Sequence, residues 1–131
     1  MSKIKWVNEL NWTEEHLEDL RNAGYAYLRQ GKYDIAINFF EALTVLDQES
    51  AYDSQTLGAL YLQLGDPKKA IKWLDHALKI EGDHGPILLN LCKALFMLGK
   101  KEEGLKLAHI LKNESNIKIS NVAKALILAN S

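Results

Sequence analysis

The sequence repeats itself at an offset of 34 residues, and this periodicity restricts the fold more than any other feature of the chain. The offset links Gly24 with Gly58, Tyr27 with Tyr61 and Leu95, Gly31 with Gly65 and Gly99, Ala36 with Ala70 and Gly104, and Leu43 with Ala77 and Leu111. This is the length of a helix–turn–helix unit that buries its apolar face against the next unit. We therefore expect one all-α domain with repeats at 17–50, 51–84 and 85–118, preceded by an N-terminal segment at 1–16 and followed by a capping helix at 119–131.

The recurring glycines predict where helices approach one another and where they end. Gly24 and Gly58 lie inside the first helices of their repeats, where glycine costs about 1 kcal/mol relative to alanine. That cost is understandable if a neighbouring helix must come close at these positions. Gly31, Gly65 and Gly99 are expected to end the first helices, because glycine is common just past a helix end.

Both ends of the repeat region carry helix signals. Thr13, followed by Glu14 and Glu15, is typical of an N-cap with acidic residues in the first turn, so a helix should begin there. Near the C-terminus, Ser120 is expected to cap a last helix, since a stack of repeats needs its final apolar face covered. The apolar face of that helix would consist of Val122, Ala123, Leu126 and Ile127.

Composition and motifs exclude several classes of function. A net charge of -1 gives no reason to expect nucleic acid or an acidic membrane surface as a partner. No apolar run approaches the roughly 20 residues of a membrane span, and Asn8 and Glu9 interrupt the stretch where a signal peptide would be apolar, so we expect a cytoplasmic protein. Neither metal-ligand spacing around Cys92, nor a phosphate-binding loop, nor a nucleophile elbow occurs. The sequence thus predicts no enzyme activity, no catalytic or metal-binding residues and no cofactor.

The repeated residues resemble the tetratricopeptide repeat family over residues 17–112. Repeat one carries Gly24, Tyr27, Gly31, Tyr33, Ala36, Phe40 and Asp47, and repeat two carries Gly58, Tyr61, Gly65, Ala70, Ala77 and Leu78. Repeat three departs from the pattern, with Cys92 where glycine is usual and Gly104 where alanine is usual. The resemblance implies a right-handed superhelix whose first helices line a concave groove that receives peptide segments.

A narrower resemblance spans the junction of repeats one and two. It is carried by Gly31 through Phe40, Ala42-Leu43, Val45-Leu46-Asp47, Leu57-Gly58-Ala59 and Gln63. These residues are similar to those of bacterial type III secretion chaperones of the tetratricopeptide class, which keep export substrates soluble in the cytosol. The resemblance implies a secreted needle or translocator subunit as partner, bound alone or with a co-chaperone, and it leaves needle and translocator subunits as alternatives.

In the geometry that the family implies, each first helix turns one face toward the groove. The residues predicted to bind a peptide are Arg21, Tyr25, Leu28, Arg29, Tyr52, Ala59, Leu62, Leu89, Lys93, Phe96 and Met97. A solvated helix face would be mostly charged, whereas aromatic and methionine side chains are common interface anchors. We expect the groove to hold an apolar, helical segment, oriented from the rim by Arg21, Arg29 and Lys93. The alternative is that some of these side chains only complete the core.

Two functional classes and the oligomeric state stay open. The first class is a chaperone that holds a secreted subunit, and the second is a scaffold subunit that bridges components of a protein assembly. Trp6 and Trp12 lie outside the repeats, so a homodimer through the N-terminal segment or the C-terminal helix is expected. The alternative is that both tryptophans fold back onto the first helix.

Overall fold

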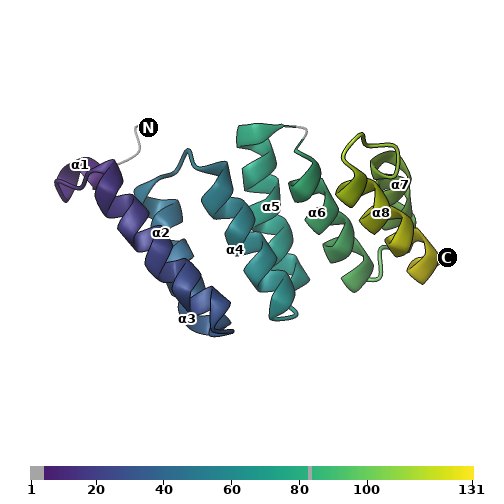
Figure 1. The fold of residues 1–131 in the computed structure, drawn as a ribbon, viewed down its shortest axis with the longest axis horizontal. Coiled ribbons are helices and arrows are strands. Elements are labelled where there is room, and N and C mark those ends of the chain that lie inside the picture. The colour runs from purple at the N-terminus through teal and green to yellow at the C-terminus, as the bar shows by residue number, and fades with distance from the viewer. Residues whose placement is uncertain (1–4, 83) are drawn as a thin grey trace.

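The computed structural model describes residues 5–82 and 84–131, and every regular element within them is an α-helix (Figure 1). The helices are α1 (Trp6–Glu9), α2 (Glu14–Arg29), α3 (Tyr33–Leu46), α4 (Ala51–Gln63), α5 (Pro67–Glu81), α6 (Gly85–Met97), α7 (Lys101–Leu111) and α8 (Ile117–Asn130). Residues 1–4 of the expected N-terminal segment and residue 83 of the expected second repeat lie outside the described residues. The predicted all-α fold class is confirmed.

The helix pairs follow one another along the long axis of the molecule in sequence order, and α8 lies against α6 and α7 at the C-terminal end (Figure 1). The helices pair as α2 with α3, α4 with α5 and α6 with α7, and α8 packs on the last pair. Adjacent pairs meet where α3 contacts α4 and where α5 contacts α6. Each pair is therefore stabilised by its immediate neighbours, as in a stack of helical repeats.

The first helix of every pair ends in the same glycine turn. Gly31, Gly65 and Gly99 have φ angles of 75°, 76° and 77°, a left-handed conformation that glycine adopts without steric cost. In the first pair, the Lys32 N–H then donates to the Tyr27 carbonyl at 3.0 Å, which satisfies an open acceptor of the helix end. The prediction that these glycines end the first helices is confirmed.

Gly24 and Gly58 make room for large side chains of the second helices. A Cβ added at Gly24 would lie 2.9 Å from Phe40 Cε2, and one added at Gly58 would lie 2.8 Å from Leu74 Cγ. Phe40 and Leu74 are both fully buried. The expected close approach is confirmed, and its cause is a bulky residue of the paired helix that occupies the space above each glycine.

The third pair reverses this arrangement of large and small residues. Cys92 stands in the glycine column, is fully buried, and donates through its S–H to the Gly104 carbonyl at 3.2 Å. Ala108 stands 34 residues after Leu74, so the second helix carries the small side chain here. The first helix gains volume where the second loses it, so the larger residue in the glycine column is matched by a smaller residue in the Leu74 column.

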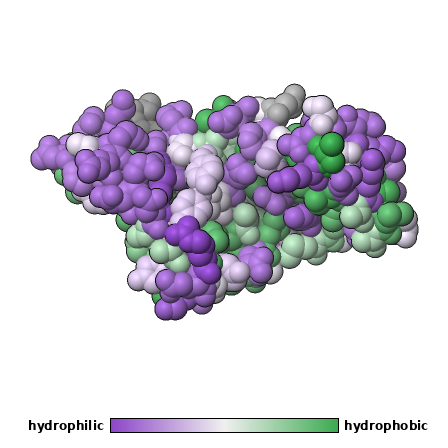
Figure 2. Space-filling view, in the orientation of Figure 1, coloured by the Kyte–Doolittle hydropathy of each residue, from purple (hydrophilic) through white to green (hydrophobic). Residues whose placement is uncertain are grey.

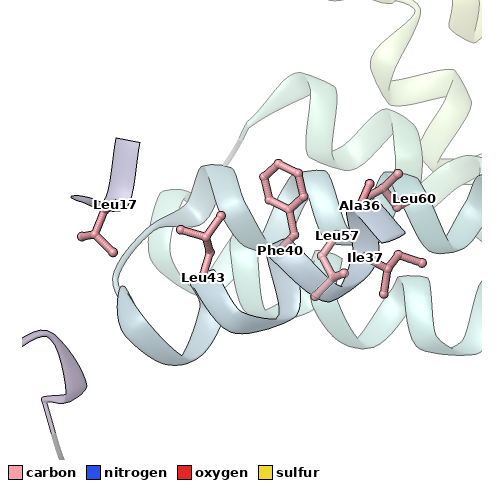
Figure 3. Packing of buried hydrophobic residues seen from close by; sticks show 7 residues of the cluster. All are labelled: Leu17, Ala36, Ile37, Phe40, Leu43, Leu57 and Leu60. Atoms are coloured by element: carbon pink, nitrogen blue, oxygen red, sulfur yellow. The ribbon is translucent and has the colours of Figure 1, made fainter. Parts of the chain in front are cut away.

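The core is divided into clusters that join neighbouring pairs. The first cluster contains Leu17, Ala36, Ile37, Phe40, Leu43, Leu57 and Leu60, drawn from α2, α3 and α4 (Figure 3). The others contain Ala70, Leu74, Ala77 and Ile87, and Cys92, Ala108, Leu111, Ile119 and Ala123. Because the clusters link successive helix pairs, apolar burial between repeats is a main source of the fold's stability.

The N-terminal region confirms the predicted start of the first repeat helix, and it places Trp6 and Trp12 in different environments. The helix α2 begins at Glu14 with Thr13 as its N-cap, as predicted, and the Thr13 N–H donates to His16 Nδ1 at 2.9 Å. Trp12 packs against the first cluster, whereas Trp6 remains 41% exposed. The two N-terminal tryptophans thus have different environments, and of these two only Trp12 packs against the core.

The helix α8 begins earlier than predicted. Its N-cap is Asn116, whose Oδ1 accepts hydrogen bonds from the N–H groups of Lys118 at 3.0 Å and Ile119 at 3.4 Å. Ser120 lies inside the helix, is buried, and donates to the Lys112 carbonyl at 2.6 Å. The prediction of a Ser120 cap is wrong, because an asparagine side chain one turn earlier already satisfies the free amides.

The inner face of α8 covers the last helix pair. Ala123 is buried, and Leu126 and Ile127 pack against the C-terminal cluster. Val122, which was expected on this face, is 36% exposed. The helix nevertheless acts as the expected cap, because it contacts both α6 and α7.

Candidate peptide-binding groove

The first helices α2, α4 and α6 form the face on which a groove was predicted, and their spacing is uneven. The backbone of α4 approaches α6, whereas within the described residues α2 and α4 have no such backbone approach. Side chains span the gap instead: the Tyr25 hydroxyl lies 3.3 Å from Thr56 Oγ1, and the Tyr25 and Tyr52 ring centroids are 6.1 Å apart. The side-chain link leaves room for two adjoining hollows between α2 and α4.

The first hollow, which we call the apolar pocket, has a volume of about 360 Å³. It is lined by Leu28, Tyr33, Tyr52, Gln55, Thr56, Ala59, Leu60 and Gln63. Tyr52 is 55% exposed at its edge. Its apolar and aromatic lining is suited to bury a partner's apolar side chain.

The second hollow, which we call the acidic pocket, has a volume of about 460 Å³. It is lined by Glu18, Arg21, Asn22, Tyr25, Asp47, Glu49, Ser50 and Tyr52. Three carboxylates therefore face one guanidinium in this lining. Tyr52 belongs to both pockets, so its ring separates an apolar compartment from a negatively charged one.

Arg21 is the centre of an ion-pair network beneath the acidic pocket. Its Nε donates to Asp53 Oδ1 at 2.9 Å, and its Nη2 donates to Asp53 Oδ2 at 2.8 Å and to Asp47 Oδ2 at 2.7 Å. Its Nη1 donates to Glu18 Oε1 at 2.7 Å. The hydrogen bonds to Asp53 raise the pKa of Arg21 further above its already high ordinary value, so the guanidinium stays charged.

The network corrects the expectation that Arg21 lies at the groove rim. Arg21 is buried and Asp53 is fully buried, and the guanidinium is shared among three carboxylates. Its positive charge is therefore more than balanced within the protein. The residue ties α2 to α4 and to the turn before α4, and it leaves the pocket with excess negative charge.

Tyr25 has a related structural role. Burial raises the pKa of its hydroxyl, so the side chain is neutral under ordinary conditions. The ring meets Phe40 edge to face, with centroids 5.3 Å apart. Tyr25 thus supports the wall of the acidic pocket from the first cluster.

The remaining predicted residues fall into two groups. Leu62, Leu89 and Phe96 are half-buried and pack against the core clusters. Phe96 also fills the space over Gly104, where an added Cβ would lie 2.7 Å from its ring. These three side chains support the alternative that part of the predicted face completes the core.

The second group is exposed. It consists of Arg29, Lys93 and Met97, and Met97 is 48% exposed. In the space-filling view the N-terminal end of the molecule is mostly hydrophilic, and hydrophobic atoms gather further along, over the middle helices and towards the C-terminal end (Figure 2). The exposed apolar surface in this view therefore lies beyond the hydrophilic N-terminal end.

Several lining residues were not predicted, because the family geometry assigns the groove to the first helices of the repeats. Tyr33 begins a second helix, while Asp47 and Glu49 belong to the turn before α4. Tyr33 and Asp47 match the family pattern, and that match was the available signal for their importance. No sequence signal marked Asp53 as the buried partner of Arg21.

The described residues lack the features of a membrane span and of a metal site. Across residues 5–82 and 84–131, no helix combines the length and apolarity that crossing a membrane requires. In the same part of the chain, no group of three or more His, Cys, Asp or Glu side chains is arranged to hold a metal ion.

The paired helices, glycine turns and capping helix define a tetratricopeptide-type repeat domain. Residues 29–109 match the sequence profile of the family described as anaphase-promoting complex, cyclosome, subunit 3. This match covers more than half of the chain, and the chain belongs to this family of tetratricopeptide-type repeat proteins.

Most of this chain is similar in sequence to one part of a much longer protein. The mitochondrial import receptor subunit TOM70 of Saccharomyces cerevisiae is 31% identical over 97 residues, which are 71% of this chain and 16% of TOM70. The chain thus spans about a sixth of the length of this relative.

Solved structures resemble the whole fold. The type III secretion translocator chaperone SycD of Yersinia enterocolitica superposes with a TM-score of 0.78 at 23% identity, covering 98% of each chain. PcrH of Pseudomonas aeruginosa, in complex with the chaperone binding region of PopD, gives a TM-score of 0.78 at 22% identity, covering 89% of this chain and 92% of PcrH. At these identities the likeness establishes a shared helical repeat fold.

Proposed function

We propose that this protein is a cytoplasmic chaperone that holds an apolar, helical segment of a secreted type III secretion subunit between its first helices. Holding the segment prevents premature assembly or aggregation of the subunit. The observation that carries the proposal is the apolar pocket, which stays open because α2 and α4 are joined by side chains rather than by backbone packing. The pocket offers the segment the burial that it would otherwise find in its own assembly.

The structural relatives support the choice of partner. SycD is a translocator chaperone, and PcrH is seen with the chaperone binding region of PopD. The superposition with these structures covers 98% and 89% of this chain. Because both relatives are associated with translocator proteins, we favour a translocator subunit over a needle subunit as the partner. A co-chaperone remains part of the proposal for a needle-type substrate.

Co-expression with translocator and needle subunits, followed by pull-down and affinity measurement, tests this function. Tyr52→Ala should weaken binding of the cognate subunit by about 2 kcal/mol, as truncation of an interface anchor does, and Ala59→Glu should weaken it by placing a charge in the apolar pocket. Ile110→Ala is the matched control, because Ile110 is 67% exposed on α7. Wild-type binding by the pocket variants, with loss in the Ile110 variant, would place the contact elsewhere.

A scaffold subunit is the second candidate function. The observation that favours it is the family profile, which describes a subunit of a multi-subunit complex. A scaffold would remain in a stoichiometric complex throughout, whereas a chaperone releases its substrate. Purification from the native cell separates the two, since a permanent complex that lacks secreted subunits supports the scaffold.

A further inference from the structure

The acidic pocket has a composition that the proposed chaperone function does not by itself explain. Its lining carries the carboxylates of Glu18, Asp47 and Glu49, and Arg21 is its basic residue. The Arg21 guanidinium is already bonded to the buried carboxylate of Asp53 as well as to two of the lining carboxylates. With Glu49, which also lines the hollow, four carboxylates are present for one guanidinium, so the hollow presents a net negative potential to a ligand.

The same pocket has an aromatic wall. The Tyr25 and Tyr52 rings stand at 50° to one another with centroids 6.1 Å apart, and Tyr52 is 55% exposed. A cation placed over a tyrosine face is attracted by the ring as well as by nearby carboxylates. The alkyl stem of a lysine or arginine also suits an apolar wall, because its charged head can remain among polar groups.

The position of Tyr52 couples the two pockets. Its side chain lines both the acidic pocket and the apolar pocket, so one bound segment that passes over Tyr52 can fill both. Glu49 in the turn before α4 and Glu18 on α2 line the acidic pocket together with Tyr52. The charge is thus concentrated at one end of the α2–α4 groove, which makes the groove directional.

We propose that the groove selects partner segments in which an apolar side chain for the apolar pocket is accompanied by a lysine or arginine for the acidic pocket. This inference rests on the proposed function, because it assumes that a partner segment occupies the α2–α4 groove. The basic residue sets the orientation of the segment and discriminates against acidic segments of equal hydrophobicity. The occupant is a segment of a partner protein, chosen because its charge complements that of the pocket.

Selection from a random peptide library tests the proposal with a defined probe. The wild-type protein should enrich peptides that combine apolar residues with a nearby lysine or arginine. The variant Glu18→Gln/Glu49→Gln should still enrich apolar peptides but without the basic preference. Both glutamates are exposed, and a glutamine at position 18 can still accept the hydrogen bond from Arg21, so the variant should keep the fold. Glu103→Gln/Glu114→Gln serves as the matched control with the same change in net charge.

Fluorescence anisotropy with one enriched peptide gives the quantitative test. Replacing its basic residue by glutamine should weaken binding to the wild-type protein about tenfold, the combined effect of a partly exposed ion pair and a cation–π contact. The same replacement should have little effect on binding to the Glu18→Gln/Glu49→Gln variant. Enrichment of apolar peptides with no basic preference would overturn this inference and leave the proposed function standing. Failure to enrich apolar peptides at all would contradict the proposed function itself.

Discussion

The contact between Gly58 and Leu74 allows a quantitative test of how paired helices fit together. A Cβ at position 58 would lie 2.8 Å from both Cγ and Cδ2 of Leu74, so Gly58→Ala pushes against the branch point of a fully buried side chain. Overpacking of this kind costs about 1–3 kcal/mol, while replacing a helical glycine by alanine returns about 1 kcal/mol. We therefore expect a net destabilisation of roughly 0–2 kcal/mol.

The second half of the test removes the obstacle. Leu74→Ala alone leaves a cavity and should cost about 2–5 kcal/mol. In the double variant the new methyl at position 58 occupies part of that cavity without a clash, as Cys92 does opposite Ala108 in the third pair. The double variant should therefore be more stable than the sum of the single changes predicts, by about 1–2 kcal/mol.

Urea denaturation followed by far-ultraviolet circular dichroism measures all four proteins of this cycle. The wild-type protein and each single variant provide the controls for the double variant. Effects that add within about 0.5 kcal/mol would mean that the two positions do not compete for the same space. That result would show that the Leu74 side chain is not the reason why position 58 requires glycine.

Three further predictions concern other parts of the structure. Arg21→Ala should lower the free energy of unfolding, measured by urea denaturation, by about 3–5 kcal/mol, because it leaves Asp53 buried without its counter-ion. A loss below about 1 kcal/mol, which is typical of an exposed ion pair, would contradict a buried network. Burial raises the pKa of Cys92 to about 11, so its thiol should react with an aromatic disulfide reagent at neutral pH only after the protein is denatured. Rapid reaction of the native protein would show that the Cys92 thiol is accessible to solvent. If the exposed ring of Trp6 supports a homodimer, Trp6→Ser should yield monomers in sedimentation, whereas a wild-type protein that is already monomeric would remove that proposal.

The repeat architecture was predictable because its signals are local and recur. Glycine past a helix end needs only its neighbours to adopt the left-handed turn, so Gly31, Gly65 and Gly99 could be assigned directly. In the third repeat the Gly99 turn was assigned in the same way, although two of the repeat's small residues depart from the pattern. The match between Cys92 and the small Ala108 depends on how α6 packs against α7, which the repeat pattern does not show.

The candidate site was less predictable, because it depends on which side chains satisfy one another over long sequence separations. Arg21 and Asp53 lie 32 residues apart, and nothing in either local sequence marks them as a pair. Phe96 illustrates the same limit, since its helical position suggested a groove residue while its ring fills the space over Gly104. Helical periodicity assigns a residue to a face, whereas packing decides whether that face is available to a partner.

The restriction of contacts to adjacent helix pairs has a consequence for the order in which the protein is made. The first core cluster and both pockets are formed by residues no later than Gln63, so these parts are translated in the first half of the chain. Helical proteins with contacts close in sequence fold quickly, and N-terminal parts fold first during synthesis. The groove can therefore take shape on the ribosome while α8, which caps the other end, has yet to be translated.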